Sequence, residues 1–217
     1  MDIFEAMEKR HSVRQYIEKP LGAEEALALS EEIKLCNEEG GLHIQLVKDE
    51  PKAFSGFMAH YGKFSGVTNY IALVGPKGPD LDEKCGYYGE RLVLKAQELG
   101  LNTCWVAMTY SKIPGAFKVE KGEALTVVIA VGYGKTEGVP HKSKAPEEVS
   151  NVSANSPEWF KNGVRAALLA PTAVNQQKFY FTLENGKVTA KAKTAFYSKV
   201  DLGIAKYHFE LGAGRQI

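Results

Sequence analysis

The sequence lacks the features of secreted, membrane-spanning and zinc-binding proteins. Its three cysteines among 217 residues form neither an even set nor a CxxC pair, which argues against a disulfide framework and a structural zinc site. No apolar run reaches the roughly 18 residues that a membrane-spanning helix needs. Residues 1–8 intersperse acids among apolar residues, so they lack the continuous apolar core of a signal peptide. We expect a reducing, cytoplasmic location.

The charge balance and the absence of nucleotide-binding motifs exclude further classes. Lys plus Arg is 27 and Asp plus Glu is 26, so no excess of one sign draws the whole chain to nucleic acid or to an anionic membrane. There is no GxGxxG after the first expected strand and no P-loop, which leaves a Rossmann site and a nucleotide hydrolase unsupported. The histidines have no neighbours at metal-ligand spacing. Any anion site must therefore be local, and we expect no nucleic-acid, membrane or metal partner.

The sequence does have the composition and periodicity of a mixed α and β protein. With 44% hydrophobic and 24% charged residues, it can bury one substantial core. Asn185-Gly186 is a strong hairpin signal, and the stretch 133–157 is expected to be a long surface connector. The pattern of apolar residues predicts helices at 3–10, 23–36, 88–99, 159–169 and 199–211, of which 88–99 ends at Gly100 and 199–211 ends at Gly212. It predicts strands at 42–47, 70–74, 103–107, 125–132 and 179–183.

The first candidate site is the segment Arg10-His11-Ser12-Val13-Arg14, just past the first expected helix. Two guanidiniums and a hydroxyl flank two backbone amides here, which suits a phosphate because Arg offers planar bidentate donors. From charge spacing alone, a solvated basic turn is the simpler interpretation. The order of residues resembles the N-terminal signature of the nitroreductase family: Arg, a basic or polar residue, Ser, an aliphatic residue, Arg or Lys, one residue, then an aromatic residue. The matching residues are Arg10, Ser12, Val13, Arg14 and Tyr16.

The second candidate, here named the Asn loop, is Ala170-Pro171-Thr172-Ala173-Val174-Asn175-Gln176-Gln177. Proline and small residues allow a flat ligand to approach the backbone, and the amides of Asn175 and Gln177 can both donate and accept hydrogen bonds. A helix C-terminal turn with polar caps is the alternative. The loop resembles the second family signature, Ala-Pro-Ser-Ala-x-Asn-x-Gln-Pro-Trp, with Thr172 for Ser and Lys178-Phe179 for Pro-Trp. Two signatures in one chain argue against a chance match.

The Asn loop lies much later in this chain than in typical family members, where it follows soon after the first signature. The expected place holds Cys36-Asn37-Glu38-Glu39-Gly40-Gly41, which cannot do the same job. In typical members two protomers share each flavin site, one giving the Arg/Ser signature and the other much of the Asn loop. We therefore hypothesise a fusion: residues 1–150 form a nitroreductase-like unit, and 151–217 form a partial second unit within the same globule. Such a monomer would imitate the family dimer, and a homodimer of it stays open.

The resemblance implies an α+β fold: a nitroreductase-like α/β/α layered arrangement, with a central, mostly antiparallel sheet flanked by helices and a pseudo-dimer within one chain. By spacing, Ala107 and Met108 fall in the loop whose N–H groups point toward flavin N5 and O4. Lys63 falls where the family often has a lysine near flavin N1 and O2, although a solvated lysine is an equal alternative. Lys144, and second to it Lys142, falls where a basic residue meets the phosphate.

The resemblance further implies an FMN-dependent oxidoreductase. NADH or NADPH would pass hydride to flavin N5, and a nitroaromatic, quinone-like or other electron-poor small molecule would then accept it in the same space, without a protein nucleophile. Arg14 and Lys63 would supply positive charge near N1 and O2, and the Met108 amide a donor at N5. The expected cofactor-binding residues are Arg10, His11, Ser12, Arg14, Lys63, Ala107, Met108, Lys142, Lys144, Pro171, Thr172, Ala173, Asn175 and Gln177.

Two alternatives stay open at this point. A flavin-binding or flavin-sequestering protein could use the same scaffold with little turnover, and a dehalogenase-like or ring-fragmenting relative could use it for other chemistry. Aromatic residues that could line an acceptor pocket are Phe57, Tyr87, Tyr88 and Trp105. Aromatic residues at these spacings are more often part of the core, so the sequence singles out none of them.

Overall fold

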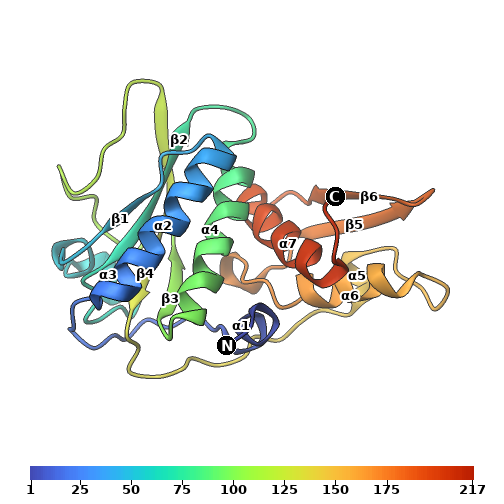
Figure 1. The fold of residues 1–217 in the computed structure, drawn as a ribbon, viewed down its shortest axis with the longest axis horizontal. Helices are drawn as coiled ribbons and strands as arrows, with labels where there is room; N and C mark the ends of the chain where they lie inside the picture. Colours follow the sequence, from blue (N-terminus) through green and yellow to red (C-terminus); the bar gives the residue numbers. More distant parts are fainter.

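The computed structural model describes all residues from 1 to 217. Figure 1 shows its elements in space. The helices are α1 (Ile3–Lys9), α2 (Ala23–Gly40), α3 (Phe57–Tyr61), α4 (Leu81–Glu98), α5 (Pro146–Val149), α6 (Glu158–Ala167) and α7 (Ser198–Ala213), with 3₁₀ turns η1 (Lys52–Phe54) and η2 (Ala173–Asn175). The strands are β1 (Gln45–Val47), β2 (Tyr70–Pro76), β3 (Asn102–Val106), β4 (Glu123–Gly132), β5 (Phe179–Glu184) and β6 (Lys187–Ala192).

A four-stranded antiparallel sheet in the order β1-β2-β4-β3 forms the centre of the larger part of the molecule. The inner strands β2 and β4 are nearly continuous apolar runs because both of their faces are buried. Ile71 and Ile129 face the core shared with α2 and α4. Tyr70 and Ala130 face a second core that Phe54 and the loops around η1 and α3 close. The expected antiparallel sheet flanked by helices is confirmed.

The C-terminal part adds the hairpin β5–β6 with α6 and α7, and it extends to the right of the main sheet in Figure 1. The expected hairpin turn is present, since Asn185 has φ 50° and Gly186 has φ 76°, as a type I′ turn requires. Phe181 stacks on Phe209 of α7 with ring centroids 4.5 Å apart. A single apolar core runs from α2 and the main sheet through α4 and α7 to this hairpin.

Helices α4 and α7 join the two parts of the chain through direct backbone contact. A Cβ atom added to Gly86 would overlap the carbonyl oxygen of Val200, and one added to Gly203 would overlap the carbonyl oxygen of Glu83. Only glycine allows two helices to approach this closely. The contact brings the start of α7 next to the main sheet, and this placement forms one wall of the candidate site described below.

Several element boundaries differ from the expectation. Helix α4 begins at Leu81 rather than at 88, because its buried Gly86 and Gly89 are weak helix formers that obscure the pattern. Helix α7 continues through Gly212 and ends before Gly214, which takes the left-handed C-cap conformation with φ 65°. Two expected loop regions also contain short helical pieces, η1 with α3 and the four-residue α5.

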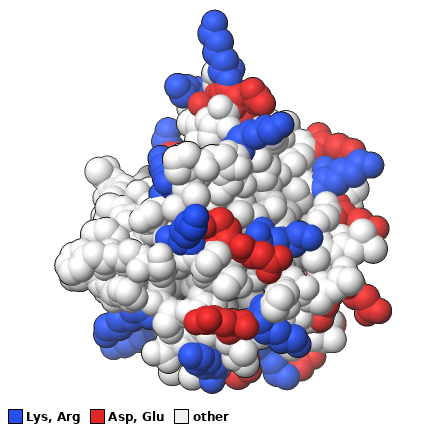
Figure 2. Space-filling view, turned by 90° about the vertical axis from the view of Figure 1, so that its left-hand side faces the viewer, with Lys and Arg blue, Asp and Glu red and all other residues white.

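The surface and the cysteines add two findings. Basic and acidic side chains are interspersed on the face shown in Figure 2, beside a broad area without charged groups. Cys36, Cys85 and Cys104 are free thiols, all buried. None of the helices is both long enough and apolar enough to cross a bilayer.

Candidate functional site

A cleft of about 880 Å³, open mouth included, lies where the two parts of the chain meet. The lining is mostly apolar, as cofactor sites usually are. One wall is the end of β3 and the loop after it, residues 104–109. The opposite wall is the Asn loop from Pro171 to Val174 together with the start of α7. Ser12 and Arg14 border the same cleft, so both candidate segments contribute to it.

A smaller cavity next to the cleft contains the first four expected phosphate ligands. Arg10, His11, Ser12 and Arg14 line it from one side, and Pro171, Thr172, Val174 and Asn175 of the Asn loop line it with His141 and Val139 from the other. The fold thus brings together two segments that lie far apart in the sequence. The chain positions the first segment by hydrogen bonding: the Val13 N–H donates to the Thr103 carbonyl, which aligns residues 12–13 along the edge of β3.

Arg10 is the most unusual group of this smaller cavity. Its side chain is only 4% exposed, yet its Nε atom has no hydrogen-bond partner. The nearest anion is Glu90, whose Oε1 lies 3.8 Å from Nε. Burial lowers the pKa of Arg10, and the carboxylate of Glu90 acts against that effect. Glu90 therefore gives Arg10 an ion pair without a hydrogen bond, and burying a donor without a hydrogen bond is costly.

His11 and Arg14 flank this position with different electrostatic character. Burial, and after it the positive charge of Arg10, lowers the pKa of His11 below its usual 6.5. His11 is therefore a neutral hydrogen-bonding group near pH 7. Arg14 is exposed and borders the cleft, the smaller cavity and a third cavity that also contains Lys63 and Ala107. Lys63 itself is exposed and has φ 61°, in the left-handed region.

The loop after β3 presents free backbone donors to the cleft. Ala107 and Met108 both line it, and Met108 is 67% exposed. Their N–H groups donate to no protein acceptor. Trp105 precedes them and borders both the cleft and the third cavity. Cys104 also lines the cleft, but burial raises the pKa of its thiol, so it stays protonated.

The Asn loop is tied to segment 142–144 by a hydrogen-bond network. Asn175 Nδ2 and Gln177 Nε2 donate to the Lys142 carbonyl at 2.8 Å and 3.0 Å. The Lys144 N–H donates to Gln177 Oε1 at 2.9 Å, and its Nζ donates to the carbonyls of Gln176 and Gln177 at 2.8 Å and 3.2 Å.

This network indicates a different role for three residues that we expected to bind the cofactor: Gln177, Lys144 and Lys142. Gln177 is buried, and its side-chain amide is used by hydrogen bonds to Lys142, Lys144 and Asn175. Neither Gln177 nor Lys144 lines the cleft or the smaller cavity, and Lys142 contributes its carbonyl while its side chain is exposed. Instead of pointing at a ligand, Lys144 and Gln177 hold the Asn loop in place. Pro171, Thr172, Ala173 and Asn175 do border the cavities as expected.

The Asn loop is also held from the side of α7. Val174, Asn175 and Gln177 have φ of 43°, 56° and 46°, a conformation that branched residues rarely adopt. Asp201 accepts hydrogen bonds from the Ala173 N–H at 2.9 Å and from Gln176 Nε2 at 2.7 Å. Its side chain is 2% exposed, and burial raises its pKa to about 6. The strained backbone therefore depends on contacts from two separate segments.

Sequence reasoning missed several residues of the site. His141 lines the smaller cavity, and its Nε2 lies 2.9 Å from the Leu168 carbonyl. Asp201, Phe196 and Tyr197 line the cleft from the start of α7. No local pattern marks these residues, because only the packing of α7 on α4 brings them to the cleft.

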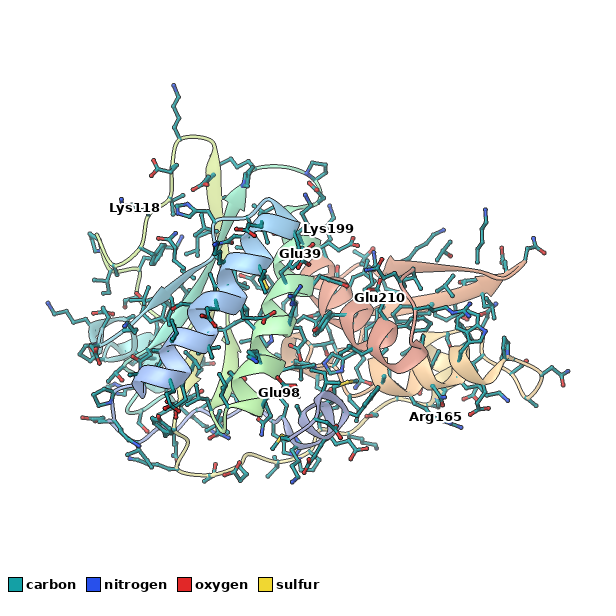
Figure 3. All side chains as sticks on the ribbon, in the orientation of Figure 1. Glu39, Glu98, Lys118, Arg165, Lys199 and Glu210 are labelled. Carbon is teal, nitrogen blue, oxygen red and sulfur yellow. The ribbon has the colours of Figure 1, made fainter.

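Of the four aromatic candidates, Trp105 alone borders the cleft. Phe57 is 81% exposed and lines none of the three cavities. Tyr87 donates a hydrogen bond to Glu210 of α7, which Figure 3 labels, and the Tyr87 ring packs edge-on against Tyr88. Tyr87 and Tyr88 thus belong to the helix packing rather than to the pocket.

The comparisons with known proteins agree with this geometry. The model of the family described as "Putative TM nitroreductase" matches residues 2–213. The structure is similar to that of a "putative nitroreductase" from Thermotoga maritima, with a TM-score of 0.68 and 25% identity over 100% of this chain and 87% of that one. The expected nitroreductase-like fold is thereby confirmed. No curated protein sequence matches the chain.

Two further solved structures share the fold at lower identity. A "putative nitroreductase in complex with fmn" from Desulfovibrio desulfuricans has a TM-score of 0.55 and 15% identity, over 72% of this chain and 98% of that one. A "Putative NADH dehydrogenase/NAD(P)H nitroreductase" from Bacteroides thetaiotaomicron has a TM-score of 0.50 and 20% identity, over 71% of this chain and 98% of that one.

Proposed function

We propose that this chain, which belongs to the nitroreductase family, is an FMN-dependent oxidoreductase. The model of that family spans residues 2–213. The chain would take electrons from NADH or NADPH and pass them to electron-poor small molecules such as nitroaromatics or quinones. The observation that carries the proposal is the buried Arg10, whose Nε has no hydrogen-bond partner, next to a mostly apolar cleft that both family signatures border. A bound FMN in the Desulfovibrio relative and NAD(P)H in the name of the Bacteroides relative support it.

The smaller cavity fits the phosphate end of FMN. A phosphate beside Arg10 would receive charge-assisted hydrogen bonds from the guanidinium, whose Nε has no hydrogen-bond partner in the protein. The Ser12 hydroxyl and the neutral imidazole of His11 are further donors on the same side. Arg14 adds a second positive charge at the border with the cleft. This end of the site selects a phosphorylated ligand over one without a phosphate.

The cleft fits the flat, largely apolar ring system of a flavin. Bound there, FMN would supply the two-electron redox chemistry. The free N–H groups of Ala107 and Met108 would donate to polar atoms at the ring edge. Arg14 and Lys63 would stabilise negative charge on a reduced ligand, because both border the cavity beside Ala107.

The same cleft leaves a place for a second small molecule. Met108, Phe196 and Tyr197 offer apolar and aromatic surfaces along its border. The nicotinamide donor and the electron-poor acceptor would occupy this space in turn, which gives alternating, ping-pong use of one site. The chain needs no nucleophile for this scheme, and the protonated thiol of Cys104 is consistent with that.

The proposal extends to the assembly. Both family signatures border one cavity within this chain, so a monomer could build the flavin site that typical members divide between two protomers. Residues 1–150 would act as the first unit and 151–217 as the partial second unit. We expect one FMN per chain in a monomer, measured by flavin absorbance together with solution mass. A strict need for dimerisation before FMN binds would contradict this part.

A flavin titration tests the binding site directly. Arg10→Gln should weaken FMN binding at least about tenfold, because charged hydrogen bonds contribute roughly 1.5–3 kcal/mol, and should change riboflavin binding far less. Arg165→Gln is the matched control, since Arg165 is exposed on α6 and pairs with Glu158 away from the cleft (Figure 3). Equal losses for FMN and riboflavin would remove the phosphate assignment.

Turnover is tested by anaerobic mixing of the FMN-loaded protein with NADH or NADPH. Bleaching of the flavin absorbance by either nicotinamide, followed by recovery with a quinone or nitroaromatic compound, is the expected result. A protein that binds FMN but is bleached by neither would be a flavin-binding or flavin-sequestering protein instead. A protein that takes up no flavin would overturn both functions.

A further inference from the structure

A fully buried carboxylate lies behind the two cavities. Glu90 of α4 is 0% exposed, and three side chains from different elements converge on it. Trp105 Nε1 donates to its Oε2 at 3.0 Å, and His208 Nε2 lies 2.8 Å from its Oε1. Arg10 Nε lies 3.8 Å from the same Oε1. Glu90 thus connects the residue at the smaller cavity with the residue at the cleft wall.

His208 fixes this carboxylate from the opposite side. Its Nδ1 lies 3.2 Å from the Ala166 carbonyl, which can only accept, so Nδ1 carries a proton. Its Nε2 faces Glu90, and one hydrogen bond joins the two groups. Glu90 is therefore anchored by α7 and by the carbonyl of α6, and its position does not depend on Arg10.

The contact between Glu90 and Arg10 differs from the other two. A distance of 3.8 Å is too long for a hydrogen bond, so only charge attraction acts between them. The carboxylate already accepts from Trp105, and its Oε1 lies within hydrogen-bond distance of His208 Nε2. Arg10 Nε consequently has no hydrogen-bond partner although a counter-ion is near.

We propose that Glu90 is a positioning residue with two roles: it holds the Trp105 indole in the cleft wall, and it balances the charge of Arg10 while leaving the guanidinium donors free for an incoming anion. The identity of that anion as the FMN phosphate rests on the proposed function. The two roles themselves concern residues of this chain alone. They are separable, because one depends on the reach of the side chain and the other on its charge.

Two substitutions separate the roles. Glu90→Gln keeps the length and an oxygen acceptor for Trp105 but removes the charge. Glu90→Asp keeps the charge but is one methylene shorter, so it cannot reach Trp105 and His208 together. Glu98→Gln is the control: it removes the same charge near the carboxyl end of α4, where Glu98 contacts Lys95 (Figure 3). A Trp159→Phe background leaves Trp105 as the single indole, since the chain has two tryptophans.

The first readout is the fluorescence of Trp105 in the flavin-free protein. Glu90→Asp should shift the emission to longer wavelength, because the indole loses its buried acceptor and gains contact with water. Glu90→Gln and Glu98→Gln should leave the emission where it is in the parent. An unshifted emission in Glu90→Asp would overturn the positioning of Trp105.

The second readout is binding of inorganic phosphate, followed by the rise in Tm. Glu90→Gln should lower Tm without phosphate and bind phosphate about threefold more tightly or better, because Arg10 then lacks its balancing charge. Glu90→Asp and Glu98→Gln should bind phosphate like the parent. Unchanged or weaker binding in Glu90→Gln would overturn the charge-balancing role.

Loss of folding would also be informative. If Glu90→Gln does not fold, adding Arg10→Met should restore folding, since it removes the unbalanced cation. Failure to restore folding would overturn the charge-balancing role.

If Glu90→Asp does not fold, hydrogen exchange of the two indole N–H groups in the unaltered protein tests the positioning of Trp105. The Trp105 N–H should exchange far more slowly than that of Trp159, which has no acceptor. Equal rates would overturn it. None of these measurements contains flavin, so failure of the proposed function would be seen separately.

Discussion

Asp201 should make the protein less stable as pH rises from about 4 to 7. Burial raises the pKa of this carboxyl from its usual 3.8 to about 6, although hydrogen bonds from Gln176 and Ala173 oppose the shift. The folded protein then binds this proton more tightly than the unfolded chain does, so stability is greatest at low pH and is lost as the group ionises. At about 1.36 kcal/mol per pH unit of pKa difference, the full effect is about 3 kcal/mol.

Urea unfolding at several pH values measures this effect. Asp201→Asn removes the titration, and Asp49→Asn, which alters an exposed Asp, is the control. The free energy of unfolding of Asp201→Asn minus that of the parent should grow by about 2 kcal/mol between about pH 4.5 and pH 7.5, the part of the total that lies in this window. Subtracting the parent removes the contributions of other carboxyls, such as Glu123 and Asp80. Their pKa values are lowered by their hydrogen-bond partners His43 and Lys84, so these two groups make the protein more stable as pH rises.

A difference that stays constant with pH would refute the reasoning. It would mean that the carboxyl of Asp201 titrates alike in the folded and the unfolded chain. The hydrogen bonds from Ala173 and Gln176 would then compensate fully for burial. If the free energy of unfolding of Asp201→Asn differs from that of the parent by the same amount at every pH, the difference reports only the hydrogen bond that the Asn amide fails to make with Gln176.

Two further substitutions test the packing and the strain of the backbone. Gly203→Ala should lower the free energy of unfolding by more than about 3 kcal/mol, because its Cβ would overlap the Glu83 carbonyl oxygen. A decrease below about 1 kcal/mol in a thermal melt would contradict the close helix contact. Val174→Asn should raise the free energy of unfolding by roughly 1 kcal/mol, because the side chain is 81% exposed and its φ of 43° suits Asn better than a branched residue. Equal or lower stability in urea would argue against strain in the Asn loop.

The parts of the site that sequence reasoning found are those written in consecutive residues. Arg10 to Arg14 and Pro171 to Asn175 each form a local motif, so their residue types indicate a ligand before the fold is known. Strands β2 and β4 were found for a similar reason, since both are continuous apolar runs, whereas no strand was predicted at β6. Both signals lie within short stretches of chain.

What sequence reasoning missed depends on contacts between distant segments. Asp201 and Tyr197 reach the cleft only because Gly203 lets α7 approach α4. Lys144 has the charge expected of a phosphate ligand, but the carbonyls of Gln176 and Gln177 take up its amine. The pairing of a lysine with backbone carbonyls leaves no trace in composition or spacing.

The glycine contacts between α4 and α7 have a mechanical consequence for the cleft. Because backbone meets backbone at Gly86 and Gly203, the two helices cannot slide past each other at this point without a clash. Helix α7 carries one wall of the cleft, and the opposite wall, at the end of β3, belongs to the sheet that packs on α4. We therefore expect the cleft to keep its width when a ligand enters through the open mouth, so that it admits flat rings more readily than bulky ones.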